Sequence, residues 1–458
     1  MPKSTQKSRV LDMTDGNIAR LLLSFAFPIF VGCVLQQVYN LADTAIAGHL
    51  LGDDALAQIG ATAALYSLIT SFCIGLTNGL SLPVSRCFGS GKMDEMRTSA
   101  CWMIILSFAV AVIMTAGFLI FRYPLLRVLQ TPEDTFAGVM SYITVILAGI
   151  PLAMIYNTES GLLRAIGNSI TPLIFLIVSS VINVILDVLF MGPLHFGVQG
   201  AATATILAQA ISVILCFFYI LKNYPQLHMK REDLHVSSGF VMEMFVTGMS
   251  MALMNAVFSI GSVILQSSIN ALGNVYIAAQ VGGRRLAELF MMPGAALSTS
   301  TATFSSQNYG AGKPDRVKKS YFISLGYSFG VGLALGSALF FFGRAFLALF
   351  TTESAVIDAG MKRVAVMAFA YCISAFMDCT IAASRGLGKT VVPTIIVVMG
   401  SCVFRVIWVY TIFAHFHTIP ALYLLYPCSW TLTAFAEILY FVHCYKQSMA
   451  LFKEPQAA

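Results

Sequence analysis

The sequence predicts an all-α integral membrane protein with twelve transmembrane helices in two pseudo-symmetric six-helix bundles. Of its 458 residues, 58% are hydrophobic and only 10% are charged, whereas soluble domains carry roughly 25% charged residues. Apolar stretches long enough to cross a bilayer, at least ~18 residues each, recur along the whole chain. Related segments also recur at a constant spacing, which divides the chain into expected bundles at residues 1–228 and 229–458.

Each expected span is bounded by short polar connectors and can satisfy its backbone hydrogen bonds as a helix. Residues 1–19 are polar and mixed in charge, with no apolar core leading to a small-residue cleavage site, so the first span is expected to act as its own signal. In chain order, the twelve expected spans are 20–47, 55–84, 99–121, 138–161, 171–192, 199–221, 240–268, 276–304, 321–343, 363–384, 392–414 and 420–444.

An internal repeat supports the division into two bundles. Since each copy holds six spans, both copies enter and leave the membrane on the same side. That is the parallel-repeat layout of some secondary transporters, with the pseudo-symmetry axis along the membrane normal. The matched pairs, each 221 residues apart, are RAIGNSITP (164–172) with RGLGKTVVP (385–393), FGSGK ending at Lys92 with YGAGK ending at Lys313, and Leu51-Gly52 with Leu272-Gly273.

The polar connector at residues 223–239 joins the two copies and marks the expected domain boundary. It contains Pro225 and charges of both signs. Two interpretations stay open at this stage. The connector is either a tether between two bundles that move relative to each other, or a plain solvated loop.

The distribution of positive charge predicts the orientation in the membrane. The formal net charge is +6, from 27 Lys and Arg against 21 Asp and Glu. With the N-terminus inside, nineteen Lys and Arg residues fall in inner connectors and tails, five fall outside, and three fall within spans. This bias predicts a multi-pass protein of the cytoplasmic (inner) membrane with both termini cytoplasmic. The basic balance therefore reflects topology and does not indicate a nucleic-acid partner.

Ionisable residues inside the expected spans are the main candidates for function. A charged side chain at the centre of a bilayer costs about 3 kcal/mol, so those present usually face a cavity or a partner. The candidates are Asp43, Asp187, Arg284, Arg285, Glu288, Asp378, Arg405 and Glu437.

In the first expected span, the stretch LQQVYNLADTAIAG (35–48) places polar residues at spacings of three and four, which puts them on one helix face. The residues on this face are Gln36, Tyr39, Asn40 and Asp43. In the fifth span, Asn183 and Asp187 are four apart and also share a face. The repeat replaces them with Phe404 and Trp408, so this polar pair belongs to the first half alone.

If the first and fifth spans meet, two carboxylates and several carboxamides converge there. Burial favours the protonated carboxyl, and repulsion between two carboxylates is relieved by a bound cation. The arrangement predicts a proton or small-cation site. The alternative is a structural hydrogen-bonded cluster that holds helices together.

The second half carries a different set of charges. Arg284 and Glu288 are four apart in the eighth span, and Asp378 and Arg405 come from the tenth and eleventh. They could form an internally neutralised network or contact a substrate, and the sequence leaves both open. Glu437 has no evident partner in the sequence, and we expect it to be structural.

The sequence resembles the multidrug and toxic compound extrusion (MATE) family over essentially its whole length. The stretches that carry the resemblance are LQQVYNLADTAIAG, RAIGNSITP, INVILD (182–187), GAATAT (200–205) and SSQNYGAGK (305–313). The resemblance implies an inverted V of two six-helix bundles. It also implies efflux of organic, often cationic or amphipathic, compounds in exchange for protons or sodium ions.

The resemblance also implies roles for particular residues. A family ion site in the N-terminal bundle falls on Asp43, Asn183, Asp187 and Thr205, and a family Asn falls on Asn157. Another branch places a Glu in the seventh helix for a C-terminal cation site, but Met254 and Asn255 stand in that region, which argues against a sodium site there. The residues expected to line the substrate cavity are Gln36, Tyr39, Asn40, Asn157, Asn255, Arg284, Glu288, Asp378 and Arg405.

Together these observations predict an alternating-access antiporter that exports small organic molecules and needs no cofactor or bound metal beyond its coupling ion, H⁺ or Na⁺. We expect its partners to be these substrates and the lipid bilayer, with no nucleic acid, and we expect a monomer. A flippase for a lipid-linked precursor is the alternative within transport. An enzyme is not expected, because the sequence contains neither an HExxH motif nor a GxxxxGK[ST] loop.

Overall fold

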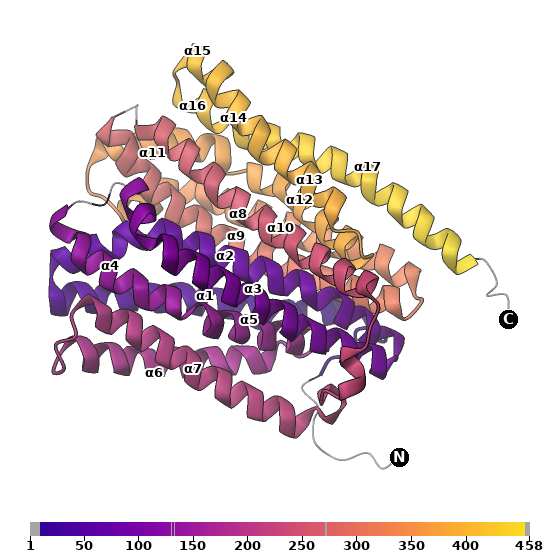
Figure 1. Ribbon diagram of the computed structural model, residues 1–458. Helices are drawn as coiled ribbons and strands as arrows, with labels where there is room; N and C mark the ends of the chain where they lie inside the picture. Colours follow the sequence, from indigo (N-terminus) through magenta and orange to yellow (C-terminus); the bar gives the residue numbers. More distant parts are fainter. Residues whose placement is uncertain (1–9, 130, 132, 271–272, 454–458) are drawn as a thin grey trace. The chain divides into compact units, whose positions relative to one another are not determined.

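The computed structural model describes residues 10–129, 131, 133–270 and 273–453 (Figure 1), and these residues form helices and connecting segments with no β-strand. The helices of the first half are α1 (Ile18–Leu51), α2 (Asp53–Ser90), α3 (Met93–Val128), α4 (Glu133–Ala148), α5 (Ile150–Ala165), α6 (Ile170–Met191) and α7 (Val198–Asn223), followed by the short 3₁₀ turns η1 (Pro225–Leu227) and η2 (Arg231–Leu234).

The second half repeats this order. Its helices are α8 (Ser238–Asn270), α9 (Asn274–Gly310), α10 (Pro314–Ala348), α11 (Ser354–Met367), α12 (Ala370–Gly386), α13 (Val391–Val397), α14 (Phe404–Trp408), α15 (Ala414–Phe416), α16 (Ile419–Tyr423) and α17 (Leu425–Lys453). Two π-helical segments, η3 (Val398–Val403) and η4 (Val409–Phe413), interrupt the span that begins with α13.

The expected spans coincide with helices or helix pairs, except that 392–414 is a run of short α- and π-helical segments. Within the described part of the chain, nine helices are long and apolar enough to cross a membrane, and eleven spans result if each of two bent pairs counts once. The expected span at 276–304 is α9, which is less apolar because it carries Arg284, Arg285 and Glu288 before a run rich in Ser and Thr.

The two bent pairs occur at equivalent places in the repeat. The pair α4 and α5 bends by 42°, and the pair α11 and α12 bends by 49°. The first break is at Gly149, with Pro151 in the first turn of α5, where a missing backbone N–H is tolerated. A Cβ at Gly149 would lie 2.5 Å from side-chain carbons of Ile206, so α7 packs directly against this break.

The repeated segments at 164–172 and 385–393 end their helices in the same way. Gly167 follows α5 with a φ of +88°, and Gly388 follows α12 with a φ of +81°. Each donates its N–H to the carbonyl of the arginine three residues earlier, Arg164 or Arg385, at 2.9 and 2.8 Å. Positive φ favours glycine in such helix-ending turns, which explains why both segments contain it.

The chain packs as two compact units. Unit 1 comprises Val31–Ala252 and the chain start up to Leu11, and unit 2 comprises Asp12–Phe30 and Leu253–Ala458. The expected boundary at residues 228 and 229 concerns the repeat and stays a prediction. In unit 2, Arg316 donates to the carbonyls of Met13 and Gly16 at 3.0 and 2.9 Å, which attaches the segment just before α1 to this unit.

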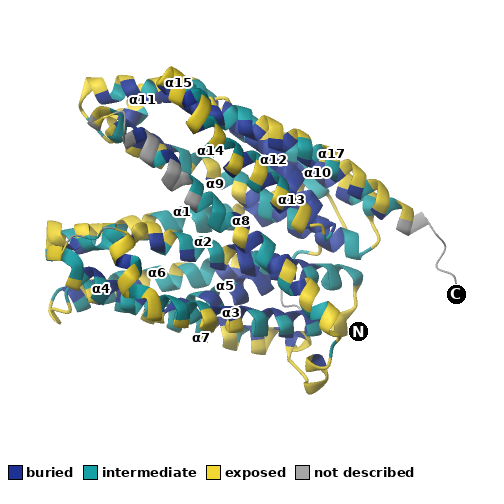
Figure 2. Cartoon of the chain, turned by 45° about the horizontal axis from the view of Figure 1, so that its top comes forward, coloured by how far each residue is buried: buried dark blue, intermediate teal, exposed yellow. Residues whose placement is uncertain are grey.

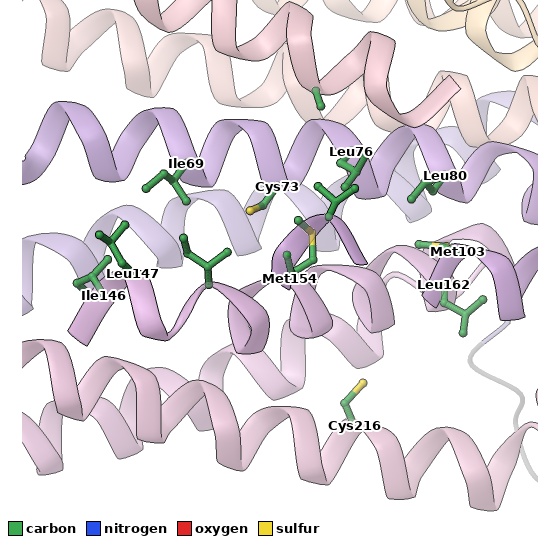
Figure 3. Close-up of a cluster of buried hydrophobic side chains, with 14 of the residues drawn as sticks. Ile69, Cys73, Leu76, Leu80, Met103, Ile146, Leu147, Met154, Leu162 and Cys216 are labelled. Atoms are coloured by element: carbon green, nitrogen blue, oxygen red, sulfur yellow. The ribbon is translucent and has the colours of Figure 1, made fainter. Parts of the chain in front are cut away.

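The core of unit 1 is built around α2. Ile69, Cys73, Leu76 and Leu80 follow a helical spacing that lines one face of this helix. Figure 3 shows this stripe facing apolar side chains from α3, α4 and α5, among them Met103, Leu147, Met154 and Leu162.

In unit 2, α12 takes the central position. It packs against α9, α10 and α17, and most of its residues are buried (Figure 2). A Cβ at Gly386 would collide with Cβ of Ser305, so the end of α12 approaches α9 closely.

The connector between the repeats is fastened to unit 1 by a buried ion pair. Asp233 in η2 accepts hydrogen bonds from Arg97 Nε at 3.0 and 2.8 Å, and its backbone carbonyl accepts from the Trp102 indole at 3.0 Å. The Asp233 side chain is only 2% exposed. This part of the connector is therefore neither a free tether nor a plain solvated loop.

Candidate functional site

The structure brings Asp43 of α1 and Asp187 of α6 together. Their carboxyl groups lie close enough to interact with each other. Asp187 is completely buried and Asp43 is half-buried. Two carboxyl groups can form a hydrogen bond only if one of them carries a proton. Two carboxyl groups at this range can therefore share one proton.

A chain of hydrogen bonds supports Asp187. The Asn183 amide, oriented to satisfy both of its ends, donates to Asp187 Oδ2 at 2.8 Å and accepts from the Thr205 N–H at 3.1 Å. The Thr205 hydroxyl accepts from the Tyr39 hydroxyl at 3.3 Å and donates to the Ala201 carbonyl. Asn183 and Thr205 are buried. The four residues expected to form the N-terminal ion site thus lie in one connected group, with Tyr39 beside them.

One oxygen of each acid, Oδ1 of Asp43 and Oδ1 of Asp187, is buried without a hydrogen-bond partner among the described residues. A buried carboxylate oxygen without a donor is unfavourable. A proton or a small cation would satisfy these oxygens. The described part of the chain has no cluster of three His, Cys, Asp or Glu residues suited to a metal ion, so a cation here would rest on two carboxylates and neutral oxygens.

Two tyrosines extend this site beyond what the sequence indicated. Tyr66 of α2 and Tyr142 of α4 both lie within electrostatic range of Asp43. Tyr142 is 8% exposed. Neither shares a helix with another residue of the site, so no spacing in the sequence could reveal them. Two phenol groups, one from α2 and one from α4, thus lie near Asp43.

Three other residues expected in the substrate cavity are not drawn into this group. Asn40 is exposed and Gln36 is half-buried. The Asn157 amide donates to the Ala153 carbonyl of its own helix at 2.8 Å. The three-to-four spacing on α1 therefore places Tyr39 and Asp43 in the site and leaves Asn40 on the outer part of the same face.

In unit 2, the expected charges separate into different places. Glu288 pairs with Arg284 at 3.0 Å and with Arg285 at 3.4 Å, on a partly exposed stretch of α9. Arg405 instead lies over the rings of Tyr426 and Trp430, with its guanidinium carbon 4.5 and 6.0 Å from the ring centroids.

Asp378 belongs to neither of these groups. It interacts with Arg385 and lines a cavity of about 30 Å³ with Phe290, Ser328 and Tyr371, a volume that holds about one or two waters. The interpretation of one neutralised network over Arg284, Glu288, Asp378 and Arg405 does not describe the structure. Asn255, also expected in the cavity, is half-buried on α8.

Two of the arginines counted on the inner side of the membrane lie at packed helix ends. Arg164 and Arg385 occupy the last turns of α5 and α12. Arg164 donates to Asn78 Oδ1 at 3.4 Å, and Arg385 donates to Met254 Sδ at 2.9 Å. An arginine just before a Gly-containing turn looks solvated in the sequence, whereas these two helix ends are packed.

Glu159 is a buried acid that the sequence reading missed. It is 7% exposed on α5 and interacts with Cys216 of α7. The available signal was plain, since this acid falls within the expected span at 138–161.

A known family profile matches each half of the chain once. The profile of the MatE family matches residues 28–189 and again 250–411. The two matches start 222 residues apart, one residue from the spacing of the repeat. The chain belongs to the MatE family. It is therefore a multi-pass membrane protein of the MATE transporters.

Among proteins similar to this MATE chain, the probable multidrug resistance protein YoeA of Bacillus subtilis is 25% identical, with 86% of each chain covered. An FAD transporter of Shewanella oneidensis is 27% identical, covering 74% of this chain and 76% of its own. A crystal structure of MATE in the bent conformation superposes with a TM-score of 0.90 at 21% identity, covering 98% of this chain and all of that one. That likeness supports the fold.

Proposed function

We propose that this MATE protein exports organic, cationic or amphipathic compounds from the cytoplasm in exchange for protons or sodium ions. Asp43 and Asp187 form the coupling site, held by Asn183 and Thr205. The protein acts as a monomer in the inner membrane, with both termini cytoplasmic. The observation that carries the proposal is the contact between the two carboxyl groups across α1 and α6.

The coupling follows from charge. When both carboxyls are ionised, the pair is repulsive and holds a cation or opens. When a proton binds, the repulsion is relieved and the two carboxyl groups can share a hydrogen bond. Because Asp43 lies on α1, a change in this contact changes how α1 packs in unit 1. Alternating access then follows if α1 packs differently with the pair protonated and ionised, and if each packing favours opening to a different side of the membrane.

Purified protein in proteoliposomes tests this proposal, with proton and sodium gradients imposed separately and efflux of a fluorescent organic cation recorded. We expect Asp43→Asn and Asp187→Asn to abolish gradient-driven efflux. Asp54→Asn serves as the matched control, since Asp54 is an exposed acid in the first turn of α2. Coupled efflux retained at the normal rate in Asp43→Asn would refute the coupling role.

A second candidate is export of planar anions such as a flavin nucleotide. The specific observation in its favour is Arg405, a cation stacked on two aromatic rings, because such a surface suits a flat, negatively charged ligand. The FAD transporter relative points the same way. The flippase alternative gains less support, because Arg284 and Arg285 are paired with Glu288.

Direct transport assays with each kind of substrate separate the two candidates. If planar anions are the substrates, flavin nucleotide is carried in the proteoliposomes, and Arg405→Gln lowers its transport by about tenfold, consistent with loss of a charge contact of roughly 1.4 kcal/mol. If organic cations are the substrates, the nucleotide is not carried and Arg405→Gln leaves cation efflux intact.

A further inference from the structure

A second buried acid, Glu437 of α17, lies in unit 2 and has no part in the coupling described above. It is completely buried, and neither carboxyl oxygen has a hydrogen-bond partner among the described residues. An ionised carboxylate in this position would lack any donor, which is highly unfavourable. The carboxyl group therefore needs a ligand of its own.

The group facing Glu437 across the contact of α12 and α17 is Arg385. The two interact through their charges, yet they form no direct ion pair in the described structure, and Arg385 Nε is also buried without a partner. Arg385 instead directs one nitrogen at Met254 Sδ. The arginine thus neutralises charge nearby without supplying hydrogen bonds to Glu437.

This cluster contains more acidic groups than basic groups. Arg385 interacts with both Glu437 and Asp378, so one positive charge faces two carboxyl groups. Other titratable groups also lie nearby, among them Cys379 close to Asp378 and Cys444 close to Tyr440. Tyr440 lies on α17 beside Glu437. On a neighbouring helix, Tyr321 of α10 forms a hydrogen bond with Thr380 at 3.0 Å. Arg405 of α14 donates a hydrogen bond to Ser429 at 3.2 Å, and Ser429 lies about two turns before Glu437 on α17.

Unit 1 has an equivalent pairing of an arginine with a buried acid, but there the acid lies on α5, the repeat equivalent of α12. Arg164 interacts with Cys33, and 221 residues later Arg385 contacts Met254, so the two arginines occupy equivalent positions. Glu159 of α5 interacts with Cys216 of α7. The equivalents of Glu159 and Cys216 are Thr380 and Glu437. Each unit therefore carries one carboxyl at this helix contact, contributed from opposite sides.

We propose that Glu437 is a proton-binding residue of unit 2, separate from the Asp43 and Asp187 pair. One carboxyl oxygen of Glu437 takes a proton from water and later returns it, with no other bond made or broken. In the protonated form, the positive charge of Arg385 balances Asp378 alone. In the ionised form the cluster carries a net negative charge, which favours opening of the contact between α12 and α17 to water.

Infrared difference spectroscopy of the purified full-length protein tests this directly, because a protonated carboxyl has a C=O stretching band that an ionised one lacks. The Asp43→Asn/Asp187→Asn variant removes the N-terminal pair. In that background we expect a carboxyl band that disappears as pH rises, and loss of that band on adding Glu437→Gln. The amide is nearly isosteric with the protonated acid, so the fold is expected to persist. A titrating band unchanged by Glu437→Gln would overturn the proposal.

The repeat supplies a matched exchange. Glu437→Cys alone removes the acid, while Thr380→Glu/Glu437→Cys places it on α12 as in unit 1. We expect the first variant to lose the titrating band and the double variant to recover one. A band in the parent that sodium ions remove at constant pH would show a cation site and also overturn the proposal. Since no transport is measured, failure here is distinct from failure of the coupling role of Asp43.

Discussion

At the scale of residues, the protein buries its acids in different ways. Asp187 is held by an amide donor from Asn183 at 2.8 Å. Asp233 is held by a guanidinium, and Glu437 has no hydrogen-bond donor among the residues that the structure describes. A donated hydrogen bond favours the ionised form of a carboxyl. Asn183 is therefore a positioning residue that sets how readily Asp187 gives up its proton.

Replacing Asn183 tests this role. We expect Asn183→Ala to move the pH dependence of coupled efflux upward, because Asp187 loses a donor worth about 1–3 kcal/mol to its charged form. The measurement is the pH midpoint of efflux in proteoliposomes. Asn40→Ala, on the exposed part of α1, is the matched control and should leave the midpoint in place. A midpoint that stays unchanged in Asn183→Ala would show that the amide is structural.

At the scale of elements, close contacts decide which helices can tolerate change. Gly386 at the end of α12 has no room for a Cβ, whereas a Cβ at Gly326 inside α10 would have no described atom within 4 Å beyond the neighbouring residues and backbone of its own helix. The two glycines thus differ in the reason for their presence. Gly386 permits helix contact, and Gly326 is replaceable.

We expect Gly386→Ala to destabilise the protein by about 1–3 kcal/mol, because the added methyl forces α12 away from α9. Gly326→Ala should be neutral or stabilising by up to about 1 kcal/mol, since alanine favours a helix interior. Thermal unfolding of both variants in detergent measures the difference. Equal melting temperatures for the two variants would contradict the packing described here.

The contact between η2 and α3 predicts a dependence of stability on pH. Burial would raise the pKa of the Asp233 carboxyl, but hydrogen bonds from Arg97 and its neighbours outweigh burial and lower that pKa below its ordinary value. A lowered pKa means that the contact stabilises the fold above the ordinary carboxyl pKa and loses this contribution as pH falls through the lowered one.

Thermal unfolding of Asp233→Asn should accordingly show a loss of about 3 kcal/mol at neutral pH, because Arg97 keeps a buried charge without its main partner. The loss should shrink in acid, where the parent also loses the pair. Arg97→Met/Asp233→Leu removes both charges and should recover most of the stability. A loss that is constant across pH would show that the ion pair is not responsible.

At the scale of the whole molecule, composition and repeat spacing predicted the helices well, because bilayer thickness imposes the length of every span. The meeting of Asp43 with Asp187 was also predictable, since both lie on polar faces that lipid cannot cover. The burial of side chains at helix ends was not predictable from the sequence. Arg164 and Arg385 look like loop cations until the packing of α5 and α12 is known, and Glu437 had no partner in sequence because Arg385 is 52 positions earlier in the chain.

The predicted orientation can be tested on the whole protein in cells. Glu232 in the connector and Glu353 before α11 are both exposed acids, and the positive-charge bias places them on opposite sides of the membrane. We expect Glu353→Cys to react with a membrane-impermeant maleimide in intact cells, and Glu232→Cys to react only after permeabilisation. The parent protein, with its own cysteines half-buried or buried, provides the background. Labelling of Glu232→Cys in intact cells would reverse the topology, and the proposed direction of export would reverse with it.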